Sequence, residues 1–136
     1  MTTTAALGTA EVVQEYFSRF GSGDRAAVLE LFTDRTDWNV AGSAAVPWTG
    51  RRTSPEEIDA FLADCYGLVS TEAFAVDRIL VDGEHAVALG SFTHLVTATG
   101  KRFVSDFSLH VVVVDGRIRL YHMFEDSHAA DAAFTA

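Results

Sequence analysis

The sequence has few of the residues that would tie it to an oxidising compartment, a membrane or nucleic acid. It contains one cysteine, Cys65, so it forms no internal disulfide and suits a reducing compartment. Its 10 lysines and arginines are outnumbered by 19 acidic residues, which argues against nucleic acid or an anionic membrane as a partner. No stretch approaches the ~20 apolar residues of a membrane span, and the first residues lack the basic and apolar regions of a signal peptide. We therefore expect a cytoplasmic protein.

The motifs of common cofactor and metal sites are missing as well. The sequence has no glycine-rich phosphate loop, no cysteine and histidine cluster at zinc spacing and no nucleophile elbow. Cys65 falls on the apolar stripe of an expected helix, which indicates a core residue rather than a nucleophile. We expect a protein that works without a cofactor or a bound metal.

Helical spacing of apolar residues dominates the first half of the chain. Asp24 and Ser54 have the properties of N-caps, and Ser54-Pro55-Glu56-Glu57 forms a capping box with proline in the first turn. The sequence predicts, in order, a loose tail up to Leu7, a helix over 9–20, a short helix after Asp24, a strand over 36–41 and a third helix over 55–66.

From about residue 74 the apolar pattern has a period of two, which is typical of strands. Strands are predicted over 74–81, 86–97, 103–114 and 117–126, separated by Asp82-Gly83, Thr99-Gly100 and Asp115-Gly116. A short amphipathic tail, capped by Ser127, follows. Helices before an antiparallel meander indicate an α+β fold in a single domain over residues 1–136. Three N-terminal helices packed on a curved, mostly antiparallel sheet would enclose a cone-shaped pocket.

The Asp115-Gly116 turn fixes the pairing of the last two strands. A two-residue type I′ loop places Val114 opposite Arg117, and the other pairs follow by counting outward. One face then carries mostly apolar residues, with Asp126 and His122 as the polar exceptions. A one-residue bulge would exchange the two faces of one strand. The buried polar set would then come from the residues of the other face: Asp106, Ser108, His110, Tyr121 and Glu125.

The Thr99-Gly100 turn extends this count to a third strand. If Ala98 faces Lys101, three rows cross the buried face: His94–Ser105–Asp126, Phe92–Phe107–Phe124 and Gly90–Leu109–His122. Because neighbouring strands lie ~4.8 Å apart, His94 and Asp126 would be separated by roughly 10 Å. Gly90 would leave room for a ligand at the end of its row.

A carboxylate and imidazoles on an apolar floor suit proton transfer, since burial moves both kinds of pKa toward neutrality. We predict Asp126 as base or acid, His94 and His122 as proton partners, and Tyr16 as a hydrogen-bond donor to an oxyanion. Aromatic and apolar side chains would hold the substrate: Trp38, Trp48, Phe61, Phe92, Phe107, Leu109 and Phe124. The alternatives are that Asp126 caps the following helix, that the histidines are satisfied or exposed, and that Tyr16 belongs to the core.

Three stretches together resemble the nuclear-transport-factor-2-like superfamily, in its SnoaL-like and ketosteroid-isomerase-like branch. They are EVVQEYFSRFGSGDRAAVLELF, DWNVAGSAAVPWTGRRTSPEEIDAFL and DGRIRLYHMFEDSHAADAAF. The resemblance implies a cone-shaped α+β barrel, a homodimer formed through the sheet, and a deep pocket for small hydrophobic molecules.

The resemblance also assigns roles to single positions. Tyr16 matches the first-helix tyrosine that donates to the oxyanion in ketosteroid isomerases. Their base aspartate would fall near 39–41 and their second acid near Leu109, where this sequence has no carboxylate. Asp126 matches the last-strand aspartate of limonene-epoxide-hydrolase-like members, whose arginine and aspartate partners are replaced by Thr93 and Leu95.

These observations predict a small enzyme that needs no cofactor and performs acid–base chemistry. The expected reaction is an isomerisation or cyclisation of a small hydrophobic substrate of polyketide or terpenoid type. A dehydratase or epoxide hydrolase would use the same groups. A non-catalytic binding protein with the same pocket, and a purely structural dimer, are the alternatives from other classes.

Overall fold

Four helices and six strands make up residues 8–136, the part of the chain that the computed structural model describes. The loose tail expected up to Leu7 lies outside the described residues. In chain order the elements are α1 (Thr9–Ser22), α2 (Arg25–Leu29), β1 (Phe32–Val40), β2 (Gly50–Arg52), α3 (Pro55–Leu68), β3 (Val69–Asp82), β4 (His85–Val96), β5 (Lys101–Val114), β6 (Arg117–Glu125) and α4 (Ser127–Phe134).

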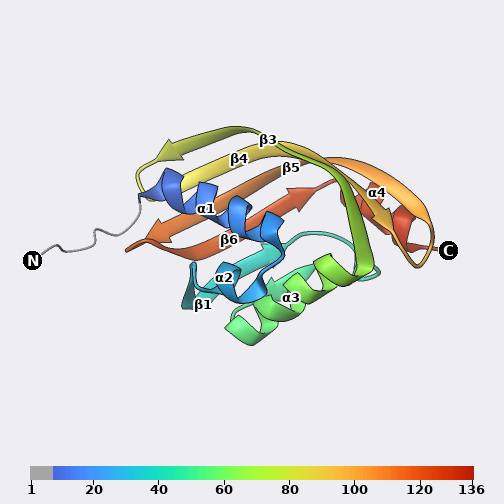
Figure 1. The fold of residues 1–136 in the computed structure, drawn as a ribbon, viewed down its shortest axis with the longest axis horizontal. Coiled ribbons are helices and arrows are strands. Elements are labelled where there is room, and N and C mark those ends of the chain that lie inside the picture. The colour runs from blue at the N-terminus through green and yellow to red at the C-terminus, as the bar shows by residue number, and fades with distance from the viewer. Residues whose placement is uncertain (1–7) are drawn as a thin grey trace, which may run out of the picture.

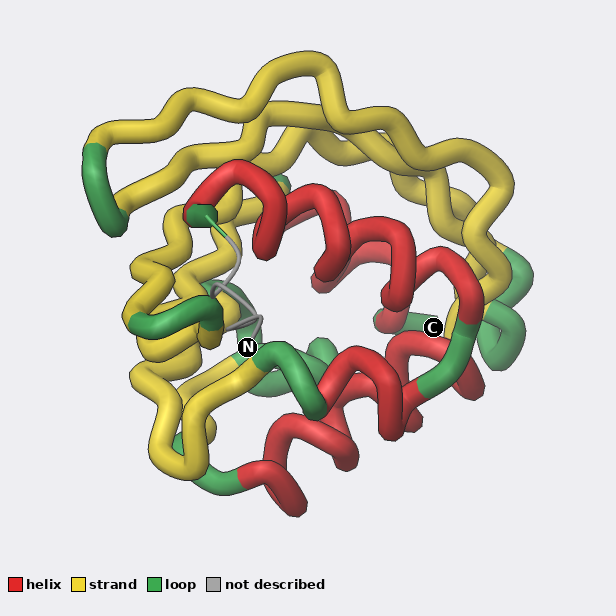
Figure 2. The backbone as a smooth tube through the Cα atoms, turned by 60° about the vertical axis from the view of Figure 1, so that its left-hand side comes forward, coloured by secondary structure: helices red, strands yellow, loops and turns green. Residues whose placement is uncertain are grey.

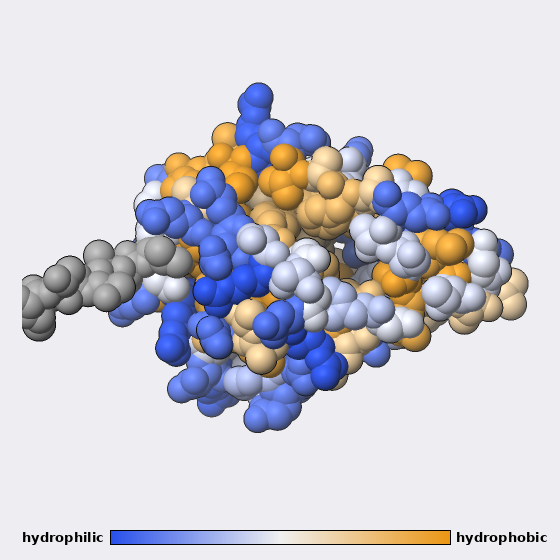
Figure 3. Space-filling view, in the orientation of Figure 1, coloured by the Kyte–Doolittle hydropathy of each residue, from blue (hydrophilic) through white to orange (hydrophobic). Residues whose placement is uncertain are grey.

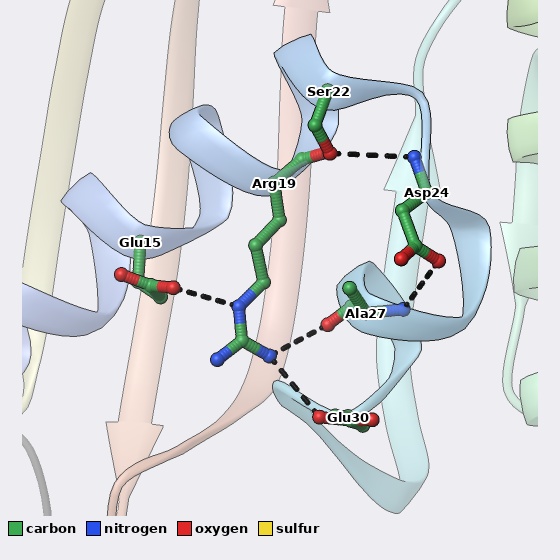
Figure 4. Close-up of polar contacts among 6 residues, drawn as sticks. All are labelled: Glu15, Arg19, Ser22, Asp24, Ala27 and Glu30. Carbon is green, nitrogen blue, oxygen red and sulfur yellow. Dashed lines mark hydrogen bonds and ion pairs between the residues drawn. The ribbon is translucent and has the colours of Figure 1, made fainter.

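The predicted end of α1 and the predicted starts of α2 and α3 are confirmed. Gly23 ends α1 in a left-handed conformation, φ 78°, with its N–H donating to the Phe20 carbonyl. The Asp24 carboxylate accepts from the Ala27 N–H at the start of α2. Ser54 and Glu57 form the expected capping box at α3. Arg19 then ties α1 to α2, donating to Glu15 at 2.8 Å and to the Ala27 carbonyl at 2.7 Å (Figure 4).

The strands form one open sheet in the order β2-β1-β6-β5-β4-β3. All neighbours are antiparallel except β1 and β6, which run parallel. The sheet curves around α1, and α3 crosses below it (Figures 1 and 2). The prediction of helices on a curved, mostly antiparallel sheet is confirmed. The sheet does not close into a barrel, however, and the predicted tail is a fourth helix, α4, capped by Asp126 rather than Ser127.

A bulge in the last hairpin overturns the predicted face of β6. Val114 pairs with Arg117 and Val113 with Ile118 as expected, but Val112 pairs with Leu120, so one residue of β6 has no partner. That residue, Arg119, stays exposed, while Ile118 before it and Tyr121 two residues after it are both buried. Beyond the bulge every β6 side chain changes face. Tyr121, Met123 and Glu125 therefore point toward the helices, and His122 and Phe124 point away.

The β4–β5 turn moves the predicted rows without changing their face. Val96 pairs with Lys101, so the turn spans residues 97–100 and the register differs by two from the predicted one. The longer turn is held by the Gly100 N–H, which donates to the Val96 carbonyl at 2.8 Å, and by the Thr99 hydroxyl, which donates to the Ala133 carbonyl of α4 at 2.6 Å. His94 now faces Phe103, and the rows predicted through His94, Phe92 and Gly90 are wrong.

Gly90 serves the protein's own packing rather than a ligand. A Cβ at this position would overlap the Ala75 carbonyl oxygen and would lie 2.6 Å from the Phe107 ring. The missing side chain therefore lets β3 and Phe107 approach β4 closely. The prediction that Gly90 leaves room for a ligand is wrong. In residues 8–136, no helix is both long and apolar enough to cross a membrane.

Candidate active site

A cavity lies between the concave face of the sheet and the helices α1 and α3. Its inner part measures about 50 Å³ and receives side chains from α1, α3, β1, β3, β4, β6 and the loop that contains Trp48. A wider opening of about 520 Å³ adjoins it where α1 ends, beside the start of β3, and Figure 3 shows the hollow there. Four residues line both parts, so the opening leads inward: Phe20, Cys65, Phe74 and His94.

Glu125 places a carboxyl group in the inner cavity. The pKa of this carboxyl is raised to about 7, chiefly by burial; a hydrogen bond from Trp48 lowers it in part, and the nearby Asp126 adds to the rise. The Trp48 Nε1–H donates to Oε2 of Glu125 at 3.4 Å. The ordinary pKa of this group is 4.5. Because the raised pKa is about 7, the carboxyl is present in both protonation states near neutral pH. Direct counting from the turn missed Glu125. The sequence did include Glu125 among the residues that a one-residue bulge would bring to the buried face of the sheet.

Two tyrosine hydroxyls meet at the wall of the same cavity. The hydroxyls of Tyr16 on α1 and Tyr121 on β6 are 2.6 Å apart, and both side chains are buried. Burial raises the pKa of each phenol well above 10, so both keep their protons. The pair has two hydrogens and uses one of them between the two oxygens. Within residues 8–136 neither hydroxyl has a second hydrogen-bond partner, so the other hydrogen is free for a ligand.

Tyr121 is fixed from behind by Trp38. The two rings stack with centroids 3.8 Å apart and planes inclined by 7°, and Trp38 is fully buried in the core. Tyr16 packs edge-on against Tyr121 at 5.3 Å. The hydroxyl pair therefore sits on rigid aromatic support, which suits a preorganised donor.

His94 stands where the inner cavity meets the opening. Its ring stacks on Phe92 at 4.2 Å, and Nδ1 lies 3.0 Å from the Thr71 hydroxyl. Burial lowers the pKa of the imidazole to about 4, so the ring is neutral at pH 7. Burial also raises the pKa of the Cys65 thiol well above its ordinary value, so this thiol stays protonated and is a poor nucleophile.

The other two predicted proton-transfer residues lie elsewhere. Asp126 is exposed, and its carboxylate accepts from the Ala129 N–H at 2.9 Å as the N-cap of α4. His122 lies on the outer face of the sheet, with Nε2 2.9 Å from the Asp37 carboxylate. The bulge turns His122 outward, while Asp126 follows the last residue of β6 and caps α4.

The predicted substrate-binding residues divide into three groups. Trp48, Phe61 and Phe92 line the inner cavity. Trp38, Phe107 and Leu109 are buried and do not line either part of the cavity, so the structure places them in the core. Phe124 points outward and is 48% exposed, again because of the bulge. Within the described residues no group of three or more histidine, cysteine or acidic side chains is arranged to hold a metal ion.

Comparison with known proteins agrees with the predicted resemblance. The family model of the SnoaL-like domain matches residues 13–121. An NTF2-like protein from Burkholderia xenovorans is 20% identical, with a TM-score of 0.86 over 93% of this chain and 95% of the other. TerC, co-crystallised with polyporic acid, is 16% identical, with a TM-score of 0.82 over 94% and 98%.

A candidate isomerase from Bacillus subtilis is also similar in structure. It is 16% identical, with a TM-score of 0.80 over 93% of this chain and 91% of the other. Among curated proteins no match to the chain is found. At these identities the solved structures show that the fold is shared.

Proposed function

The chain belongs to the SnoaL-like family, and from that premise we propose an enzyme that moves a proton within a small, uncharged, largely apolar substrate. The reaction class is isomerisation or cyclisation, with Glu125 as the acid–base group. One observation carries the proposal: the partly buried Glu125 carboxyl lies in an aromatic cavity that also contains the free hydrogen of a tyrosine pair.

The ionisation of Glu125 suits a group that both removes and returns a proton. A pKa of about 7 keeps the carboxylate available as a base, and the protonated form remains acidic enough to give the proton back. Proton abstraction beside a carbonyl places negative charge on the carbonyl oxygen. The tyrosine pair would donate its free hydrogen to that oxygen, where a buried donor is strongest. Tyr16 keeps the role of oxyanion donor, with Tyr121 as its partner.

The walls of the cavity favour an uncharged and flat ligand. In the described part of the chain, no lysine or arginine lines the inner cavity or the opening, so a buried anion would lack a counter-charge. Phe74 and Phe92 are close to parallel, inclined by 9°, and His94 continues this floor at 28° to Phe92. A planar ring system can lie on such a floor. TerC, which shares this fold, was co-crystallised with polyporic acid, and this supports a ligand-binding role for the cavity.

Hydrogen exchange of an uncharged aromatic ketone tests the proposal directly. We choose 2-tetralone in D2O, where loss of the α-proton signals is followed by ¹H NMR. The protein should accelerate this exchange over buffer alone, and Glu125→Gln should abolish the acceleration because the amide cannot take a proton. Asp126→Asn is the matched control, since asparagine also caps a helix and the change removes a neighbouring carboxylate outside the cavity.

Three outcomes separate the alternatives. Loss of exchange in Glu125→Gln together with retention in Asp126→Asn supports the proposal. Equal loss in both variants, or retention in Glu125→Gln, contradicts the role of Glu125. Quenching of tryptophan fluorescence by 2-tetralone without any exchange would instead identify a binding protein that does not catalyse the reaction.

A further inference from the structure

Trp48 makes the one hydrogen bond that the Glu125 carboxyl receives from a side chain within residues 8–136. We propose that Trp48 is a positioning residue: its indole N–H, clamped by Phe134 of α4, orients the Glu125 carboxylate and favours the ionised form. The consequence for catalysis rests on the proposed function. The effect on the ionisation of Glu125 does not.

The loop around Trp48 is rigid enough to hold the indole in one place. Trp48 is 3% exposed although it lies between β1 and β2, outside any helix or strand. The Thr49 hydroxyl donates to the Ser43 carbonyl at 2.8 Å, and the Val46 N–H donates to the same carbonyl at 3.0 Å. These bonds close the loop on itself immediately next to the tryptophan.

Three aromatic rings also pack near the indole ring. Phe134 meets it edge-on with centroids 5.1 Å apart, His94 lies at 6.1 Å and Phe103 at 6.5 Å. Phe134 is the last residue of α4, which is attached to the β4–β5 turn by the Thr99–Ala133 hydrogen bond of 2.6 Å. Helix α4 is therefore connected to the Glu125 carboxylate through the contact of Phe134 with Trp48 and the hydrogen bond from Trp48.

The Trp48 N–H and the other surroundings of Glu125 shift the pKa of its carboxyl in opposite directions. Burial and the Asp126 charge both raise the pKa of Glu125, and the Trp48 hydrogen bond lowers it. Four other titratable groups line the same cavity and keep their neutral form near pH 7: Tyr16 of α1, Cys65 of α3, His94 of β4 and Tyr121 of β6. The adjacent Asp126 is a like charge, which disfavours the ionised form of Glu125. Since a hydrogen bond to a carboxylate favours its charged form, Trp48 is the group that keeps Glu125 able to ionise near neutrality.

The experiment follows the ionisation of Glu125 itself. ¹³C NMR of carboxyl-labelled glutamate gives the titration of Glu125, assigned by its absence in Glu125→Gln. Trp48→Phe removes the N–H and keeps an aromatic ring, so the Glu125 midpoint should rise by ~0.5 to 1 pH unit. Trp38→Phe is the matched control, because Trp38 has no contact with Glu125 and the midpoint should stay as in the parent protein. Phe134→Leu retains the N–H but loosens the clamp, so it should raise the midpoint by a smaller amount.

The exchange of 2-tetralone provides a second readout. If the base form of Glu125 is the active one, the rate at pH 6 should fall roughly three- to tenfold in Trp48→Phe, and recover as the pH rises. A Glu125 midpoint in Trp48→Phe within about 0.2 pH units of the parent value would overturn the inference. The proposed function can fail separately: retention of exchange in Glu125→Gln would contradict it, while the NMR titration would still decide the role of Trp48. If Trp48→Phe does not fold, an unmoved midpoint in Phe134→Leu overturns the inference.

Discussion

Glu125 and His94 should contribute to folding stability with opposite dependence on pH. Both side chains are partly buried beside the cavity, so each loses hydration that its charged form would need. One is an acid and the other a base, so burial moves their pKa values in opposite directions. Replacing each by glutamine removes its titration and leaves a neutral polar side chain.

The contribution of Glu125 falls as the pH rises. Its pKa is about 7 in the folded protein and its ordinary value is 4.5, so between these two values the folded state binds more protons than the unfolded state. Stability then decreases with pH. At about 1.4 kcal/mol per pH unit, the interval corresponds to about 3 kcal/mol. This loss is complete above pH 7 and absent below the ordinary value.

The contribution of His94 rises with pH over nearly the same window. Its pKa is about 4 when folded, against an ordinary 6.5, so here the unfolded state binds more protons and stability increases with pH. The same conversion, reduced because part of the ring is exposed to solvent, gives about 2 kcal/mol. The two contributions largely cancel in the parent protein, and each should become visible when the other group is removed.

Chemical denaturation between pH 4.5 and 7.5 at constant ionic strength would measure both effects. Relative to the parent protein, the free energy of unfolding of Glu125→Gln should rise by about 3 kcal/mol across this range. That of His94→Gln should fall by about 2 kcal/mol from its value at the acid end. A difference for Glu125→Gln that stays constant within 1 kcal/mol, or that changes in the other direction, would refute the burial argument for Glu125.

Two further substitutions test the packing and the tyrosine pair. Gly90→Ala should lower the free energy of unfolding by about 2 kcal/mol or more, because the new methyl group meets the Ala75 carbonyl and the Phe107 ring; unchanged thermal stability would contradict this close packing. Tyr121→Phe should cost about 1 to 3 kcal/mol of stability by leaving the buried Tyr16 hydroxyl without its partner. In the same variant, exchange of 2-tetralone should slow by roughly tenfold or more, and an unaltered rate would show that the pair does not hold the oxyanion.

Local sequence signals predicted the helix starts and the Asp115-Gly116 turn well. The Asp24 cap and the capping box at Ser54 fixed two helix starts, since these side chains satisfy backbone N–H groups a few residues away. Asp115 and Gly116 both have positive φ, 51° and 77°, as the type I′ turn requires. These features depend on near neighbours in the chain, so they can be derived from the sequence.

The bulge was the feature that counting from the turn could not derive. The alternation after Arg117 fits two registers equally well, because Leu120 and Tyr121 can each be buried. Packing decides between them: Tyr121 stacks on Trp38 and meets Tyr16, both far away in the sequence. That choice turned His122 and Phe124 outward and brought Glu125 into the cavity.

The sequence by itself therefore determined the class of the fold, the starts of α2 and α3 and the turn of the last hairpin. It also predicted that a polar group lies within an apolar face of the sheet. The tertiary structure alone decided which carboxylate that is. Strand alternation has a period of two, so one extra residue exchanges the faces of everything beyond it. Whether that residue is accommodated depends on contacts between α1, β1 and β6, which lie next to each other only after the chain has folded.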